Sequence, residues 1–374
     1  MNYLNDEYEG YGAAFREKKY DAMLAAGRRV WTPTELPDLT AYLQKEKKSL
    51  DLILLAAARP KWWTPLVSGD GRSMDSAPMV GEIPGLRELD NLIGARATCR
   101  AGMGDFDGFL ADLLAVKRVA RHMSSRSGLE YDVGLEMDAC ADRAIGAVAA
   151  RGILTAAQCA TLSNALREMK TIERAAEIVN IWERWSTLDE VALIATGRAK
   201  LLGATDSVGG KFATIDRAAV DWDTVLRGVN ATFDKELQLM SRPDAPVDKA
   251  AEAASLLRMQ RAAAQSLAKQ STETRAQYTA RITRAIGGPW DITLLFAMQR
   301  QGHLIGDMTR LVVAVAAQKA MTGHWPAKAE NLLSAHLPTM PLDMAGMPVK
   351  YTVTPNGITV SGTGERGRLV SVGN

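Results

Sequence analysis

The sequence predicts a mainly α-helical protein: a multi-helix body of antiparallel hairpins, closed at the C-terminus by a small element of one helix and two strands. Over residues 1–322 apolar residues recur every three or four positions, which is the spacing of a helix face. After residue 322 prolines become frequent and short alternating segments follow, which is typical of turns and strands. The chain has 374 residues, enough to bury a substantial core.

Composition and charge exclude several classes of partner. Hydrophobic residues make up 47% of the chain and charged residues 24%, as in an ordinary soluble globular protein. The 45 basic and 43 acidic side chains leave a net charge of +2, so charge gives no reason to expect a nucleic-acid partner. Cys99, Cys140 and Cys159 have no metal-ligand spacing, and an odd number is a poor disulfide framework. We expect them to be small buried side chains in a reducing compartment.

Targeting signals are not evident in the sequence. The longest apolar runs, residues 50–58 and 311–317, are much shorter than the roughly 20 residues that span a membrane. The first fifteen residues are polar and acidic, unlike a signal peptide. For the chain as given we therefore expect no membrane span and a cytoplasmic location.

The helical body is expected to contain two long loops, at about residues 61–85 and 197–221, both rich in Gly. One helix is predicted from Leu39 to Leu54, between prolines. Further helices are predicted at residues 5–28, 129–151, 155–169, 222–240, 247–269, 272–286 and 291–321. Between the loops, Leu86 and its apolar neighbours mark a helix that Gly104 ends, and Asp105 caps the next one. This αα-hairpin resembles a tetratricopeptide-type hairpin, although the full repeat signature is missing.

The C-terminal element is expected to span residues 323–364 and to pack on the body, with residues 365–374 as a mobile tail. A short helix comes first, then an irregular turn and two strands around the hairpin signal Asn356–Gly357. A loop of these two residues predicts the pairs Pro355–Ile358, Val353–Val360 and Tyr351–Gly362. The alternation places Val353, Ile358 and Val360 on one face, which agrees with that turn.

No catalytic, cofactor-binding or metal-binding residue can be named from a motif. The four histidines match no ligand pattern, and His303 with Asp307 is interpreted as a helix-surface pair. The glycine-rich stretch near Lys211 fails the phosphate-loop pattern, because Thr205 and Phe212 replace essential residues. Carboxylates are abundant, but the sequence neither supports nor excludes a pair that faces one another.

Tryptophans are the remaining candidates for a binding surface. Trp62 and Trp63 follow Lys61 in the first long loop, and such a cluster suits a partner protein or a flat ligand. The alternative is that both rings fold back and anchor their own loop. Trp182 continues an apolar helix stripe and is expected in the core, whereas Trp325 is expected to fasten the C-terminal element to the body.

One resemblance concerns the C-terminal element. It rests on these residues: Trp325, Pro326, Pro341, Asp343, Gly346, Tyr351, Ser361 and Gly362. In this order the segment resembles the C-terminal part of type II secretion pseudopilins, and the whole chain resembles uncharacterised, mostly helical proteins of planctomycete-type bacteria. The resemblance implies a shared tail fold. Met344 replaces the second proline of the turn, and Glu365 is the one acidic residue after Ser361, so the resemblance does not extend to calcium binding.

The residues favour a non-catalytic scaffold or interaction protein over an enzyme, with a protein as its partner and no cofactor. Two alternatives stay open. One is an envelope-associated assembly component, if an N-terminal anchor has been removed from the chain. The other is an enzyme with a carboxylate-based site, which a deep cleft and raised carboxylate pKa values would support.

Overall fold

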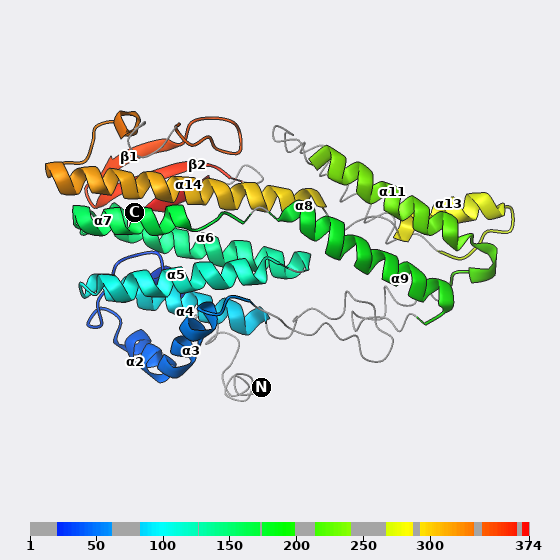
Figure 1. Ribbon diagram of the computed structural model, residues 1–374, viewed down its shortest axis with the longest axis horizontal. Helices are drawn as coiled ribbons and strands as arrows, with labels where there is room; N and C mark the ends of the chain where they lie inside the picture. The colour runs from blue at the N-terminus through cyan, green and yellow to red at the C-terminus, as the bar shows by residue number, and fades with distance from the viewer. Residues whose placement is uncertain are drawn as a thin grey trace.

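The computed structural model describes residues 21–61, 83–125, 127–172, 174–198, 214–240, 267–286, 292–332, 339–364 and 369–373. Its α-helices are α2 (Pro37–Lys45), α3 (Lys47–Ala57), α4 (Ile83–Gly102), α5 (Phe106–Met123), α6 (Gly128–Ala150), α7 (Ala156–Glu168), α8 (Ala175–Ile178), α9 (Arg184–Thr196), α11 (Trp222–Met240), α13 (Arg275–Ile286) and α14 (Ile292–Thr322). Its strands are β1 (Lys350–Thr354), β2 (Gly357–Thr363) and β3 (Leu369–Gly373). The protein is mainly α-helical with a small C-terminal sheet, as the sequence predicts (Figure 1).

Local capping explains where the central helices begin. Gly104 has φ of 80°, and the side chain of Asp105 accepts a hydrogen bond from the backbone N–H of Gly108, so the predicted turn between α4 and α5 is confirmed. The helices α6 and α7 both start with capping boxes, Ser127 with Glu130 and Thr155 with Gln158. These contacts lie within three residues of each helix start, and the predicted starts, residues 129 and 155, agree with the structure to within one residue.

The main hydrophobic core lies between α4, α5, α6, α7 and α14, and α2 and α3 cover it on one side (Figure 1). The long α14 runs along α6 and α7, and its residues 311–316 are almost entirely buried. Trp31 lies in this core, where its indole N–H donates to Ala95 O at 3.1 Å. Apolar burial of this extent is the main force that holds the helices together.

A second, smaller core lies between α9, α11 and α13, at the other end of the molecule (Figure 1). Phe233 and Tyr278 are fully buried there. A π-helical turn, Val179–Glu183, joins α8 to α9, so one continuous helical segment connects the two cores. Trp182 belongs to the main core and is buried, as predicted, whereas Val179 belongs to the second core.

The C-terminal sheet differs from the prediction in register. The structure pairs Thr354 with Gly357, Val353 with Ile358 and Tyr351 with Val360. The loop is therefore Pro355–Asn356, because the proline ring fixes φ near the value that suits the second residue of a turn. The predicted pairing is shifted by two residues along β2. A shift of two leaves each side chain on its predicted face, because side chains alternate with a period of two. Ile358 and Val360 are fully buried, whereas Val353 is about half exposed at the edge strand.

The expectation of a mobile tail at residues 365–374 is wrong for residues 369–373. They form β3, which pairs antiparallel with β2 in the sheet order β1-β2-β3. Val372 lies opposite Val360 and is 1% exposed, because both side chains pack on α6 and α14 in the main core. Burial of this side chain stabilises a strand that the sequence pattern alone does not reveal.

The two long loops are only partly described. Residues 62–82 of the first lie outside the described residues, and α4 already begins at Ile83. In the second, α9 ends at Gly197 in the left-handed conformation, and a 3-10 turn, Arg217–Ala219, precedes α11. The single helix predicted from Leu39 to Leu54 is two helices, because the chain bends at Glu46, whose φ and ψ are −84° and 2°. Of the helices predicted at residues 5–28 and 247–269, residues 5–20 and 247–266 lie outside the described residues.

Candidate functional site

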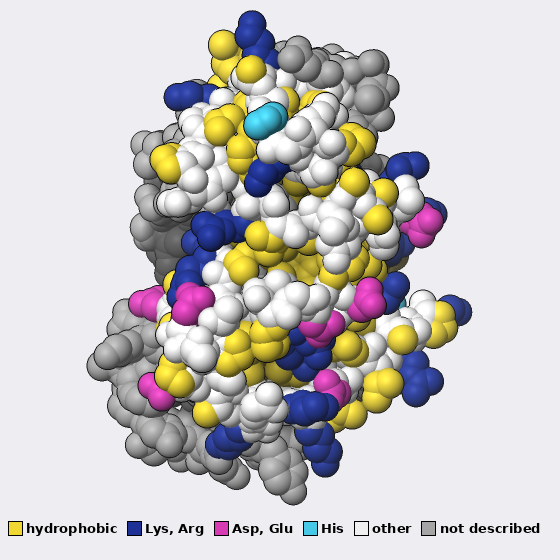
Figure 2. Space-filling view, turned by 90° about the vertical axis from the view of Figure 1, so that its left-hand side faces the viewer, with side chains coloured by type: hydrophobic (Ala, Val, Ile, Leu, Met, Phe, Trp, Pro, Cys, Tyr) yellow, Lys and Arg dark blue, Asp and Glu magenta, His cyan; other side chains and the backbone are white. Residues whose placement is uncertain are grey.

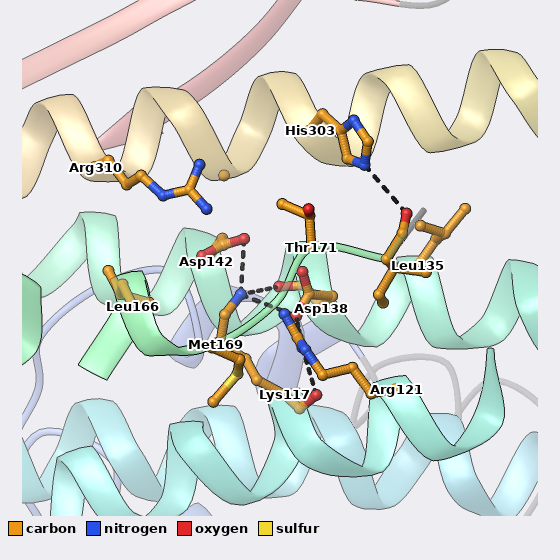
Figure 3. Close-up of a pocket in the computed structure, with 13 residues that line it drawn as sticks. Lys117, Arg121, Leu135, Asp138, Asp142, Leu166, Met169, Thr171, His303 and Arg310 are labelled. Carbon is orange, nitrogen blue, oxygen red and sulfur yellow. Dashed lines mark hydrogen bonds and ion pairs between the residues drawn. The ribbon is translucent and has the colours of Figure 1, made fainter. Parts of the chain in front are cut away.

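A buried lysine lies between two carboxylates in the middle of the main core. Lys117 of α5 is 3% exposed, and its Nζ lies 2.9 Å from Asp138 Oδ1 and 2.9 Å from Asp142 Oδ2. The two aspartates are four residues apart on α6, so both carboxylates face α5. Figure 3 shows Lys117 pointing from α5 toward both aspartates. A lysine buried to this degree needs such partners, because an unpaired charge in the core is very costly.

Arg121 extends this polar centre one turn along α5. Its Nη1 lies 2.7 Å from Asp138 Oδ1, and its Nε donates to the carbonyl of Lys170 at 2.7 Å. On the opposite side, α14 contributes His303 and Arg310 (Figure 3). The Nε2 atom of His303 is 3.1 Å from the carbonyl oxygen of Ile172. The centre therefore ties α5, α6 and α14 to the segment that follows α7.

The two aspartates of this centre differ in pKa. Burial acts to raise the pKa of Asp138, but the charges of Lys117 and Arg121 outweigh it and lower that pKa below its ordinary value. Burial raises the pKa of Asp142, and the charge of Lys117 offsets only part of that effect. Carboxylates whose pKa values diverge suit acid–base chemistry when a substrate can reach both.

The space at the centre is small. The cavity beside Lys117 and Asp142 has a volume of about 20 Å³, and it is lined by α5, α6, α14 and the segment after α7. That volume holds about one water molecule, whereas ligand pockets usually measure several hundred Å³. The polar centre as folded therefore joins helices and has no room for a substrate.

A second ionic cluster fixes α3 on the bundle. Arg96 of α4 binds Asp112 of α5 with two hydrogen bonds, of 3.0 and 2.6 Å, and Asp112 is fully buried. The same guanidinium reaches Asp51 Oδ1 on α3 at 3.2 Å. The bidentate contact with Asp112 orients the guanidinium of Arg96, and its single contact with Asp51 links α3 to α4 and α5. Tyr42 of α2 adds a hydrogen bond from its hydroxyl to Glu88 at 3.0 Å.

The outer face of α3 carries two leucines that the core does not use. Leu52 is 56% exposed and Leu55 is 65% exposed, whereas Leu50 and Ala57 on the opposite face are buried. The two exposed leucines border an open hollow of about 480 Å³ between α2 and α3. The residues that line it are Gln44, Lys45, Lys47, Lys48, Asp51, Leu52 and Leu55. We call this the α2–α3 surface.

The α2–α3 surface was not among the predicted sites. In the lower part of Figure 2, where α2 lies, basic side chains lie beside hydrophobic ones. The signal in the sequence was the unbroken apolar run from Leu52 to Leu55, which is wider than the single stripe that a surface helix needs. Of the predicted binding residues, Lys61 is exposed, and Trp62 and Trp63 lie outside the described residues.

Another exposed aromatic side chain lies on α9. Trp185 is 59% exposed, and Ile181, four residues earlier, is 53% exposed. They share one face of the helical segment that joins the two cores. Trp182, by contrast, points inward and is 7% exposed.

The residues behind the C-terminal resemblance form a tight turn. Asp343 Oδ1 accepts hydrogen bonds from the backbone N–H groups of Ala345 and Met347, each at 2.9 Å, and Oδ2 accepts one from Thr363 at 2.8 Å. Burial acts to raise the pKa of Asp343, but these hydrogen bonds outweigh it and lower that pKa. Trp325 packs on the core, with Lys319 Nζ 4.5 Å from the centre of its ring.

The described part of the chain contains no group of three or more His, Cys, Asp or Glu side chains placed to hold a metal ion. His303 and Asp307 do not pair there: His303 contacts Ile172, and Asp307 binds Arg310 at 2.6 Å. None of the helices in the described ranges combines the length and the hydropathy that crossing a membrane requires. Cys99 and Cys159 are buried as expected, and Cys140 is partly buried.

Comparison with known proteins adds no relative. No family model, no curated protein and no solved structure matches the chain.

Proposed function

We propose that this protein is a non-catalytic scaffold that binds another protein through the α2–α3 surface. The observation that carries the proposal is the exposure of Leu52 and Leu55 beside a hollow, on a helix whose other face already fills the core. Scattered exposed leucines are common in soluble proteins, so the proposal depends on these two leucines sharing one helix face beside one hollow.

Two contacts also fasten the α2–α3 surface to the bundle. Arg96 of α4 forms an ion pair with Asp51 of α3, and the hydroxyl of Tyr42 on α2 donates a hydrogen bond to Glu88 of α4. A preorganised surface loses less conformational entropy on binding, so more of the contact free energy contributes to affinity. Full burial of a leucine side chain contributes about 1.5–3 kcal/mol, so two leucines at this exposure supply a substantial share of a weak complex.

A crosslinking experiment tests the proposal. A photo-reactive residue replaces Lys48, at the edge of the hollow, in cells that naturally make the protein. A matched control places it at Thr161, which is exposed on α7. We expect one discrete crosslinked protein from position 48 and none of the same mass from position 161.

The decisive variant is Leu52→Gln with Leu55→Gln in the chain that carries the crosslinker at position 48. Loss of the crosslinked product, with unchanged abundance of the protein, supports binding through the α2–α3 surface. A product of equal yield in the variant, or the same product from position 161, contradicts it.

A further inference from the structure

The hollow of the α2–α3 surface has an apolar side and a basic rim. Three lysines line it, at positions 45, 47 and 48, against one carboxylate, that of Asp51. Asp51 is itself bound by Lys47 at 2.5 Å and by Arg96 at 3.2 Å. The lining residues therefore carry three positive charges against one negative charge, and the potential in the hollow is positive.

The one other acidic side chain at the bend does not change this sign. Glu46 does not line the hollow, and counting its charge still leaves three lysines against the two carboxylates of Glu46 and Asp51. Electrostatic complementarity selects partners and speeds their encounter, so a basic rim favours a partner with carboxylates around its contact residues.

The shape of the surface favours a helix over a membrane. The chain bends at Glu46, so the end of α2 and one face of α3 together border a shallow, open hollow. A lipid bilayer is flat on this scale, whereas a helix is convex and fits its side chains into such a hollow. Leu52 and Leu55 are three residues apart, or about 4.5 Å along the axis of α3, which matches the spacing of apolar residues on a partner helix.

We propose, on the basis of the function proposed above, that the partner contributes an acidic amphipathic helix: leucine-like side chains along one face, flanked by Asp and Glu. Its apolar side chains contact Leu52 and Leu55. Its carboxylates face Lys45, Lys47 and Lys48 at the rim of the hollow.

Two synthetic peptides test this chemistry directly on the full chain. The acidic probe is a labelled helix of about five turns with leucines at helical spacing and glutamates elsewhere. The basic probe is identical except that lysine replaces every glutamate. Fluorescence anisotropy measures both. We expect the acidic probe to bind at least about ten-fold more tightly than the basic one, and its affinity to fall as salt is raised.

Variants assign the binding to the hollow. Leu52→Gln with Leu55→Gln is expected to lower the affinity for the acidic probe at least about ten-fold, because the apolar contacts are lost. Replacement of the three rim lysines by Gln is expected to lower the affinity for the acidic probe about five-fold or more and to reduce its dependence on salt concentration. The matched control, Ile181→Gln with Trp185→Gln, changes a different exposed apolar pair and is expected to leave the affinity unchanged.

Several results overturn the inference. Equal affinity for the two probes, or no effect of the leucine variant, rejects an acidic helix. Binding to vesicles of phosphatidylserine and phosphatidylcholine that requires the same leucines, with no peptide binding, assigns the surface to a membrane instead. If the peptide fails while the crosslink from position 48 still depends on Leu52 and Leu55, the partner class is wrong and the proposed function stands. Failure of both experiments rejects both proposals.

Discussion

Val372 of β3 lies directly against Gly146 of α6, and a Cβ atom at position 146 would come within 2.1 Å of Val372 Cγ1. The C-terminal sheet therefore packs on the bundle where α6 lacks a side chain. This contact explains why a strand as short as β3 has a fixed position, because Val372 fills the space above the glycine.

Gly146→Ala is expected to destabilise the protein by about 1–3 kcal/mol, because the added methyl overpacks the contact with Val372. Chemical denaturation measures the change. Gly94→Ala is the matched control: no atom lies within 4 Å of the added Cβ on α4, so its helix propensity stabilises the protein by up to about 1 kcal/mol. Combining Gly146→Ala with Val372→Ala removes the clash and is expected to recover part of the loss. Without that recovery, the clash is not the cause.

Lys117→Met is expected to cost about 3–5 kcal/mol, because it leaves Asp142 as an unpaired carboxylate in the core, while Asp138 keeps Arg121 as its partner. The control is Arg174→Met, which breaks an exposed pair with Glu177 and is expected to cost less than about 1 kcal/mol. Adding Asp142→Asn to Lys117→Met is expected to restore stability in part, since one buried charge disappears. Equal costs for the two single variants in urea unfolding would show that the lysine is not effectively buried.

Asp90→Asn is expected to make the protein more stable at neutral pH. Burial raises the pKa of Asp90 well above its ordinary value, and the nearby charge of Glu136 raises it further, while the thiol of Cys140 offsets part of the shift. In the unfolded chain Asp90 ionises with a pKa of about 3.9. The stability of the wild type therefore falls as the pH rises from about 3.9 to the raised pKa of Asp90 in the folded state. Asparagine does not ionise, so the stability of the variant does not fall in this way. The difference in the free energy of unfolding between the variant and the wild type is expected to grow from pH 3 to pH 7.

Asp221 provides the control for that pH effect, because its pKa is lowered in the folded protein whereas that of Asp90 is raised. Hydrogen bonds from Thr224 lower the pKa of Asp221, which precedes α11. Its contribution is present above about pH 3.9 and is lost as the pH falls through the lowered pKa. Asp221→Asn is therefore expected to be less stable than wild type at pH 7 and nearly equal to it at very low pH. Parallel pH profiles for the two variants would contradict the assignment.

Trp182→Ala is expected to cost about 3–5 kcal/mol, whereas Trp185→Ala changes stability by less than about 0.5 kcal/mol, because one ring is 7% and the other 59% exposed. Thermal unfolding measures both. Iodide quenching gives an independent check: the quenchable part of the fluorescence is expected to drop in Trp185→Ala and to persist in Trp182→Ala. The reverse order would show that the helix is rotated about its axis.

Local chemistry explains which elements the sequence predicted. The starts of α5, α6 and α7 depend on caps within three residues of each helix, and the turn at Gly104 depends on a single positive φ. Such contacts form whatever surrounds them, so they can be read from adjacent residues. The hairpin faces were also correct, because a period of two fixes which side chains point the same way.

Features that depend on distant residues were not predictable in this way. The alternation of β2 permits registers that differ by two residues, and the position of Pro355 in the loop decided between them. The meeting of Lys117 with Asp138 and Asp142 requires a particular rotation of α5 against α6, which no local pattern specifies. The exposure of Leu52 was likewise not predictable. Residues 52–55 are all hydrophobic, and the sequence does not show which of them are buried in the core.

Periodicity, capping and turn chemistry over a few residues were enough to predict the helical class, most of the helix ends and the change of character after residue 322. The tertiary structure decided the third strand, the buried polar centre and the α2–α3 surface. Each of these arises where segments far apart in the chain come into contact or leave a hollow, and the free energy of such contacts depends on burial and charge that only packing defines.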